Sequence, residues 1–257
     1  MDRLDTAGAR STLHMERSLK HRPDRVWRAI TEPARMAEWF PGIETVDLRL
    51  GGTMNFGDGE EGVITDLDEP RLIAYTWGGD HLRWEIVPDG EGSTLVLVHT
   101  FDDTFGAASF ASGWHTCFTE LDRSIGGLPP TEHGIDINAL HEDYLRRFGL
   151  DTATAAEPDG DGWRVRYERQ LVRKADEVWA ALDSGSPWPD AGPVAVREEQ
   201  SALEHDVPDG RVRWELKDGT GHGSRLVVSW TGTGEAARDT ALAGAPRHVE
   251  ALLARLG

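Results

Sequence analysis

The stretch that decides the fold runs from Met15 to Ile30 and reads Met-Glu-Arg-Ser-Leu-Lys-His-Arg-Pro-Asp-Arg-Val-Trp-Arg-Ala-Ile. It begins with a strand, and Pro23-Asp24 then opens a short helix, because proline suits the first helical turn and an acid suits the positive helix end. A second version, Tyr-Glu-Arg-Gln-Leu-Val-Arg-Lys-Ala-Asp-Glu-Val-Trp-Ala-Ala-Leu, occupies residues 167–182, a constant 152 positions later. This repeat predicts two copies of one domain.

The composition fits two folded domains in a reducing compartment. The chain has 257 residues, of which 39% are hydrophobic, and it contains ten tryptophans, which is typical of globular domains with their own cores. A formal net charge of −18 without a basic stripe argues against nucleic acid and membrane as partners. The single Cys117 excludes an intrachain disulfide, and neither a signal peptide nor a membrane-spanning apolar run occurs. We therefore expect a soluble, cytoplasmic protein.

After the first helix, the sequence predicts a second short helix over 33–39, an antiparallel meander and a long closing helix. Short alternating segments separated by Gly and Asp turns are typical of hairpin-connected strands rather than of βαβ units. The expected strands are 46–50, 53–56, 62–68, 72–77, 82–87 and 93–101. One helical face is then formed by apolar residues three or four positions apart, namely Phe110, Trp114, Phe118, Leu121 and Ile125. A further helix is expected within 131–148.

The second copy is shorter than the first. Trp27 and Trp84 are 57 positions apart, whereas the matching Trp179 and Trp214 are 35 apart, so 22 residues are missing where the first copy has its early hairpin. The predicted division has four parts: a flexible tail over 1–11, a complete domain with an added C-terminal helix over 12–148, a linker over 149–162, and a shortened domain over 163–257.

The order of one strand, two short helices, six strands and a long helix resembles the helix-grip fold. In this α+β fold a curved antiparallel sheet wraps around the long C-terminal helix. Several segments also resemble one family with that fold, the activator-of-heat-shock-ATPase homologue group of the SRPBCC superfamily, related to START domains and polyketide cyclases. These segments are Arg17, Val26-Trp27-Arg28-Ala29, Thr31-Glu32-Pro33, Trp39-Phe40, Gly51-Gly52, Gly62-Val63, Pro70-Arg71-Leu72, Tyr75-Thr76-Trp77 and Gly113-Trp114-His115.

The resemblance spans residues 12 to about 126, and the second copy keeps only its outer parts. It implies two tandem helix-grip domains, the second degenerate, with an apolar cavity between sheet and helix in the first. It does not imply an activity, because a fold alone does not determine a function.

The aromatic residues of the first copy are candidates for a ligand site. A mostly apolar pocket with a few placed polar groups is the usual site for a small molecule. Aromatic side chains also fill cores, and for most of these residues that interpretation competes with a binding role. The predicted ligand-binding residues are Trp39, Phe56, Tyr75, Trp77, Trp84, His99, Trp114 and Phe118.

Two charged or titratable residues each have two interpretations. His99 shares a strand face with apolar residues, so it is either a polar group inside the cavity or a histidine paired with a neighbouring strand or turn. Arg17 pairs either with Glu85 or another sheet carboxylate, or with a carboxylate or phosphate of a ligand. Its recurrence as Arg169 in the shortened copy favours the structural pair.

Three classes of function follow. The first is a binding protein that holds a small hydrophobic or amphipathic molecule in the first domain, with the second domain as a structural partner or a homodimer contact. The second is a cyclase-like or hydrolase-like enzyme that uses His99 as acid or base. The third is a co-chaperone-like module that contacts a chaperone. The chain has no metal-site, phosphate-loop, dinucleotide or serine-hydrolase motif, so we expect no metal or cofactor and assign no catalytic residue.

Overall fold

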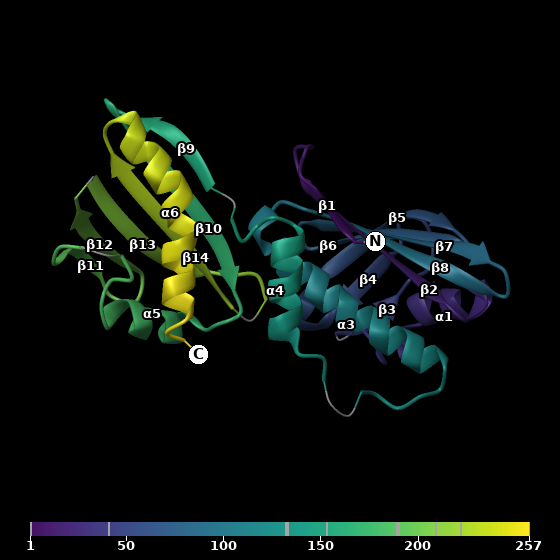
Figure 1. Cartoon of the computed structure of the whole chain (residues 1–257). Coiled ribbons are helices and arrows are strands. Elements are labelled where there is room, and N and C mark those ends of the chain that lie inside the picture. Colours follow the sequence, from purple (N-terminus) through teal and green to yellow (C-terminus); the bar gives the residue numbers. More distant parts are fainter. Residues whose placement is uncertain are drawn as a thin grey trace. The chain divides into compact units, whose positions relative to one another are not determined.

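The computed structural model describes residues 2–40, 42–131, 134–152, 154–188, 191–208, 210–221 and 223–256. The chain divides into two compact units, residues 1–107 with 111–140 and residues 108–110 with 141–257. Each unit has one antiparallel sheet, and a 19-residue helix follows each sheet, α3 (Ala107–Ile125) and α6 (Glu235–Leu253) (Figure 1). The predicted α+β class with two tandem sheet-and-helix domains is therefore confirmed. No helix in the described ranges is both long and apolar enough to span a membrane.

The first domain has an eight-stranded sheet in the order β1-β2-β8-β7-β6-β5-β4-β3. Its strands are β1 (Arg3–Asp5), β2 (Ser11–Leu19), β3 (Ile43–Val46), β4 (Thr53–Phe56), β5 (Glu61–Asp68), β6 (Leu72–Trp77), β7 (Asp80–Asp89) and β8 (Gly92–Phe101). Two short helices, α1 (Pro23–Thr31) and α2 (Pro33–Met36), connect β2 to β3. Helix α4 (Ile137–Arg147) follows α3, and its residues from His141 onward belong to the second unit.

The second domain has a six-stranded sheet in the order β11-β12-β13-β14-β10-β9. Its strands are β9 (Thr154–Asp159), β10 (Gly162–Leu171), β11 (Val194–Glu198), β12 (Ala202–Val207), β13 (Gly210–Asp218) and β14 (Ser224–Gly232), and α5 (Ala175–Asp183) follows β10. In the reverse direction the order is β9-β10-β14-β13-β12-β11, which matches β1-β2-β8-β7-β6-β5 of the first sheet. Strands β3 and β4 have no counterpart in the second sheet. The missing 22 residues are therefore the early hairpin, as the sequence predicts.

The repeat also holds for the position of the short helix and for an irregularity in strand pairing. Helix α1 begins at Pro23 and α5 begins 152 positions later at Ala175. A register irregularity falls between Ile64 and Asp66 of β5, and another falls 130 positions later in β11, between Val194 and Val196. The same irregularity at the same place in both sheets supports the view that the two sheets are copies of one another.

Two segments expected to be unstructured contain strands. The flexible tail predicted for 1–11 includes β1, and the linker predicted for 149–162 includes β9. Each pairs antiparallel with the strand that follows it, β2 or β10. The tail and the linker are thus the same element in the two copies. The backbone partner stabilises these strands, because their own polar, small-residue sequences show no alternating pattern.

The early hairpin also differs from the prediction. The strand expected over 46–50 lies earlier, as β3, and ends at Val46. The residues that follow form a turn in which the amide of Gly52 donates to the carbonyl of Arg49, at 2.8 Å. A Cβ on Gly52 would lie 1.9 Å from the carbonyl oxygen of Asp47, so this turn requires glycine.

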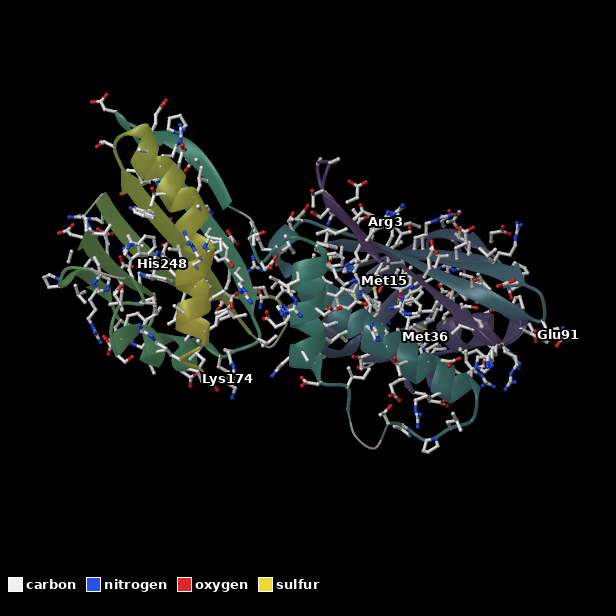
Figure 2. The ribbon with its side chains drawn as sticks, viewed as in Figure 1. Arg3, Met15, Met36, Glu91, Lys174 and His248 are labelled. Carbon is white, nitrogen blue, oxygen red and sulfur yellow. The ribbon has the colours of Figure 1, made fainter. Side chains whose placement is uncertain are left out.

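The core of each domain lies between the sheet and its long helix. On β2 the alternate residues Leu13 and Met15 are fully buried, and Met36 from α2 is buried as well. Figure 2 labels Met15 and Met36. Trp27 and its repeat Trp179 are both buried on the short helix of their domain. This repeated tryptophan is therefore a core residue in both copies.

The repeated arginine forms ion pairs in both copies, as the structural interpretation predicts. Arg17 binds Asp2, with Nη1 and Nη2 at 2.6 and 3.0 Å from the two carboxylate oxygens, rather than the expected Glu85. Arg169 binds Glu142 of α4, at 2.5 Å, and Glu250 of α6. Burial differs between the copies: the side chain of Arg17 is 24% exposed and that of Arg169 is 3% exposed.

We expect the stability of the second domain to fall in acid because of Glu142. Burial alone would raise the pKa of Glu142, but His141 and the Arg169 guanidinium outweigh it and hold the pKa below its ordinary value. A carboxyl with a lowered folded-state pKa contributes stability above its unfolded pKa and loses it as the pH falls through the folded pKa. The free energy of unfolding, measured with urea between about pH 6 and about pH 3, should begin to fall near pH 4.5. In Glu142→Gln it should fall less steeply with decreasing pH. An unchanged slope would contradict this prediction.

Candidate functional site

The predicted ligand-binding residues come together in the interior of the first domain. Trp39 follows α2, whereas Trp114 and Phe118 lie on α3. The others come from the adjacent strands β6, β7 and β8 and from β4, which β5 separates from β6. All are buried except Trp77, which is partly exposed near one end of the sheet.

The rings pack against one another around Trp84. Its centroid lies 5.7 Å from that of Trp39, 5.5 Å from that of Trp114 and 5.6 Å from that of Phe118, in edge-to-face arrangements. Phe40, which the predicted set leaves out, stacks on Trp114 at 5.7 Å and lies 5.2 Å from Trp77. Its position beside Trp39 in the sequence was a signal for including it. We call these nine side chains, the eight predicted and Phe40, the aromatic cluster.

Most indole nitrogens and hydroxyl groups of the aromatic cluster form hydrogen bonds within the protein. The indole Nε1 of Trp84 donates to the hydroxyl of Tyr75 at 3.1 Å, and that of Trp39 donates to the carbonyl of Ala29 at 2.9 Å. Trp77 donates to a carboxylate oxygen of Glu60, at 2.7 Å. Burial raises the pKa of Tyr75 far above its ordinary value, so this hydroxyl stays protonated. The cluster is therefore a packed interior with its hydrogen bonds made.

His99 links the aromatic cluster to the surface. Trp114 Nε1 lies 3.1 Å from His99 Nδ1, and because an indole nitrogen only donates, Nδ1 must be the acceptor. The ring hydrogen is then on Nε2, which lies 2.9 Å from an Asp80 carboxylate oxygen. Asp80 lies 3.6 Å from Arg10, which also binds Asp102 at 2.7 Å. The side chain of His99 is 1% exposed and that of Asp80 is 25% exposed.

Sequence reasoning missed Asp80, the carboxylate that pairs with His99. It follows Gly78-Gly79 at the first position of β7, where a turn residue is the ordinary interpretation. Strand pairing explains its place. His81, its neighbour in sequence, pairs with Thr100, which brings Asp80 to the end of β8 where His99 lies. The sequence contains no spacing that signals this contact.

Other candidates are excluded as nucleophiles or metal ligands. Burial raises the pKa of the Cys117 thiol to about 12, so the sulfur is protonated at neutral pH and is a poor nucleophile. Among the residues that the structure describes, no group of three or more His, Cys, Asp and Glu side chains could hold a metal ion. The His99–Asp80 pair is therefore the principal polar feature of the site.

An antiparallel sheet packed against one long C-terminal helix is the arrangement of the helix-grip class. Residues 20–126 match the family described as Activator of Hsp90 ATPase homolog 1-like protein. The first domain is thus a domain of this family within the SRPBCC superfamily, as the resemblance implied. The match ends at residue 126 and does not reach the second domain.

Solved structures support the fold of the first domain. A conserved protein of unknown function from Enterococcus faecalis, EF2215, is 21% identical, with a TM-score of 0.52, and the match covers 57% of this chain and 89% of that one. CalU16 from Micromonospora echinospora is 20% identical, with a TM-score of 0.48, and the match covers 58% of this chain and 94% of that one. No curated protein matches the chain. The similarity to EF2215 shows a fold and leaves the activity open.

Proposed function

We propose that the first domain binds a small hydrophobic or amphipathic molecule among the side chains of the aromatic cluster. The observation that supports this most directly is the position of His99. It is a buried polar group at the edge of an aromatic interior, and its Nδ1 faces the helix rather than the sheet partner Asp80. An apolar interior with one oriented polar group is the arrangement that fixes a ligand with an apolar body and a polar head.

The proposed ligand would take the place of the Trp114 indole at His99. Trp114 and Phe40 lie next to the partly exposed Trp77, so movement of these rings opens the cluster toward solvent at that end of the sheet. A hydroxyl head then donates to His99 Nδ1, as Trp114 does in this structure. The apolar part of the ligand then takes over the contacts that the moved rings made with the rest of the aromatic cluster.

A fatty alcohol tests this proposal. With 1-decanol, native mass spectrometry of the full chain should show one bound molecule, and the melting temperature should rise. His99→Leu removes the polar partner and should weaken binding at least about tenfold. His14→Leu is the matched control, because His14 lies on the neighbouring strand β2 but is partly exposed. Absence of a bound mass and of a thermal shift would contradict the proposal.

A second candidate function is ester hydrolysis with His99 as general base. The pair Asp80–His99 favours it, because a carboxylate that holds one ring nitrogen orients the other for proton transfer. Trp114→Phe frees Nδ1 of His99 and should raise the rate of hydrolysis of a 4-nitrophenyl ester. His99→Gln should abolish this rate with little change in melting temperature. Equal rates in the wild type and His99→Gln would rule this activity out.

A further inference from the structure

The second domain has changed the polar residues that face its interior. In the first sheet, Tyr75, Leu82 and His99 lie directly opposite one another across β6, β7 and β8. In the second sheet, the corresponding row across β12, β13 and β14 consists of His205, Val212 and Trp230. Two residues further along the middle strand, both copies have a tryptophan, Trp84 or Trp214.

The hydrogen bonds made at these positions in the first domain are lost in the second. Trp84 donates to Tyr75, but His205 at the position of Tyr75 is turned toward the loop, with Nδ1 at 3.1 Å from the carbonyl oxygen of Gly192. Within the described residues, Nε1 of Trp214, Nε1 of Trp230 and Nε2 of His205 are buried and have no hydrogen-bond partner. Buried polar groups are nearly always paired, so three on one face of one sheet need an explanation.

The three atoms offer complementary hydrogen-bonding roles. The indole nitrogens of Trp214 and Trp230 can only donate. A carbonyl oxygen can only accept, so Nδ1 of His205 carries the hydrogen toward Gly192, and Nε2 of the uncharged ring is an acceptor. Together these groups present two donors and one acceptor, which are the complement of a hydroxyl oxygen with its two lone pairs and one hydrogen.

Trp188, in the loop after α5, packs against the two tryptophans. Its ring centroid lies 4.2 Å from that of Trp230 and 6.4 Å from that of Trp214. Trp188 also stacks on His248 of α6, with ring centroids 3.8 Å apart. Figure 2 labels His248 on this helix. Burial and the neighbouring Arg247 lower the pKa of His248, so this wall is uncharged at neutral pH. The surroundings are aromatic, and a charged ligand would be costly there.

We propose that the second domain binds a small uncharged molecule with a hydroxyl group, between its sheet and Trp188. The hydroxyl accepts from Trp214 and Trp230 and donates to His205, and the apolar part of the molecule packs against Trp188. This site is separate from the aromatic cluster of the first domain. The shortened copy is then a binding domain with a polar preference of its own, rather than only a structural partner of the first.

Phenol and toluene test the proposal, because they have nearly the same shape and differ in the hydroxyl. In the full chain labelled with ¹⁵N-tryptophan, phenol should shift the indole resonances of both Trp214 and Trp230 along a saturable curve. Toluene should bind at least about tenfold more weakly, since it leaves the polar groups unpaired. The variants Trp214→Phe and Trp230→Phe assign the two resonances.

His205→Tyr gives a second test, because it restores the residue of the first copy. The new hydroxyl should accept from Trp214 as Tyr75 accepts from Trp84, so the melting temperature should rise and phenol binding should weaken at least about tenfold. His205→Phe should weaken phenol binding and leave toluene binding unchanged.

Two outcomes would overturn the proposal. The first is magnetisation transfer from water to both indole hydrogens with no saturable response to phenol, which would mean that buried water fills the polar site. The second is a phenol response confined to tryptophans of the first domain, such as Trp114. That second result would leave binding by the aromatic cluster intact, so failure of the two proposals can be told apart.

Discussion

Trp84→Ala is expected to destabilise the first domain by about 3–5 kcal/mol, the range for removing a fully buried large aromatic side chain. Trp84 is 1% exposed, and its ring contacts Trp39, Trp114 and Phe118 at once. Its removal leaves a cavity between sheet and helix, and the Tyr75 hydroxyl loses the hydrogen bond that the Trp84 indole donates to it. Amide hydrogen exchange of β7 and β8 in the full chain measures the loss, because the two domains need not unfold together.

Two milder variants separate packing from hydrogen bonding. Tyr75→Phe keeps the ring but leaves the Trp84 indole without an acceptor, at a cost of about 1–3 kcal/mol. Trp77→Ala removes a partly exposed tryptophan of the same cluster and should cost about 1 kcal/mol. If Trp84→Ala cost no more than Trp77→Ala, the rings would not be tightly packed and the interior would already be open.

The repeat was the part of the fold that sequence could predict best. A constant offset of 152 places Trp27 and Trp179 on equivalent helices, and both are buried as core residues. Alternation on β2 and the helical spacing on α3 report burial directly, since one face of each element meets the core. These patterns are local, since each can be recognised within a short segment of the sequence.

The elements that sequence missed depend on partners distant in the chain. Strand β1 has three residues and exists because Leu4 pairs with Leu13 on β2. The contact between His99 and Asp80 depends on the register of β7 with β8, which no local pattern encodes. The eight aromatic candidates could be listed from sequence, but whether their rings enclose a cavity or fill it depends on rotamers set by all of them together.

The loss of the hairpin exposes an edge that the second copy protects. In the first sheet β4 pairs with β5, and Thr53 lies opposite Val63. The residue 130 positions after Val63 is Pro193, which has no amide hydrogen to offer a neighbouring strand. A proline directly before the edge strand β11 hinders pairing with another chain at that end of the strand, so we expect any homodimer to use a different surface.

The double substitution Glu142→Gln with Glu250→Gln is expected to destabilise the second domain by about 3–5 kcal/mol, the cost of leaving a buried charge without its partners. Arg169 is 3% exposed and both its terminal nitrogens bind these carboxylates. Arginine cannot escape this cost by losing its proton. Each single variant keeps one carboxylate and should cost less, so the double variant should exceed the sum of the two.

The first domain supplies the matched control, and methionine supplies the rescue. Asp2→Asn removes the partner of Arg17, whose side chain is 24% exposed and therefore retains water, so the loss should be smaller than that of the double variant. Adding Arg169→Met to the double variant removes the unpaired charge and should recover most of the stability, because an apolar side chain of similar length tolerates burial. Urea unfolding with hydrogen exchange on β10 measures both. If methionine gave no recovery, the cost would come from lost packing around α6 and not from the buried guanidinium.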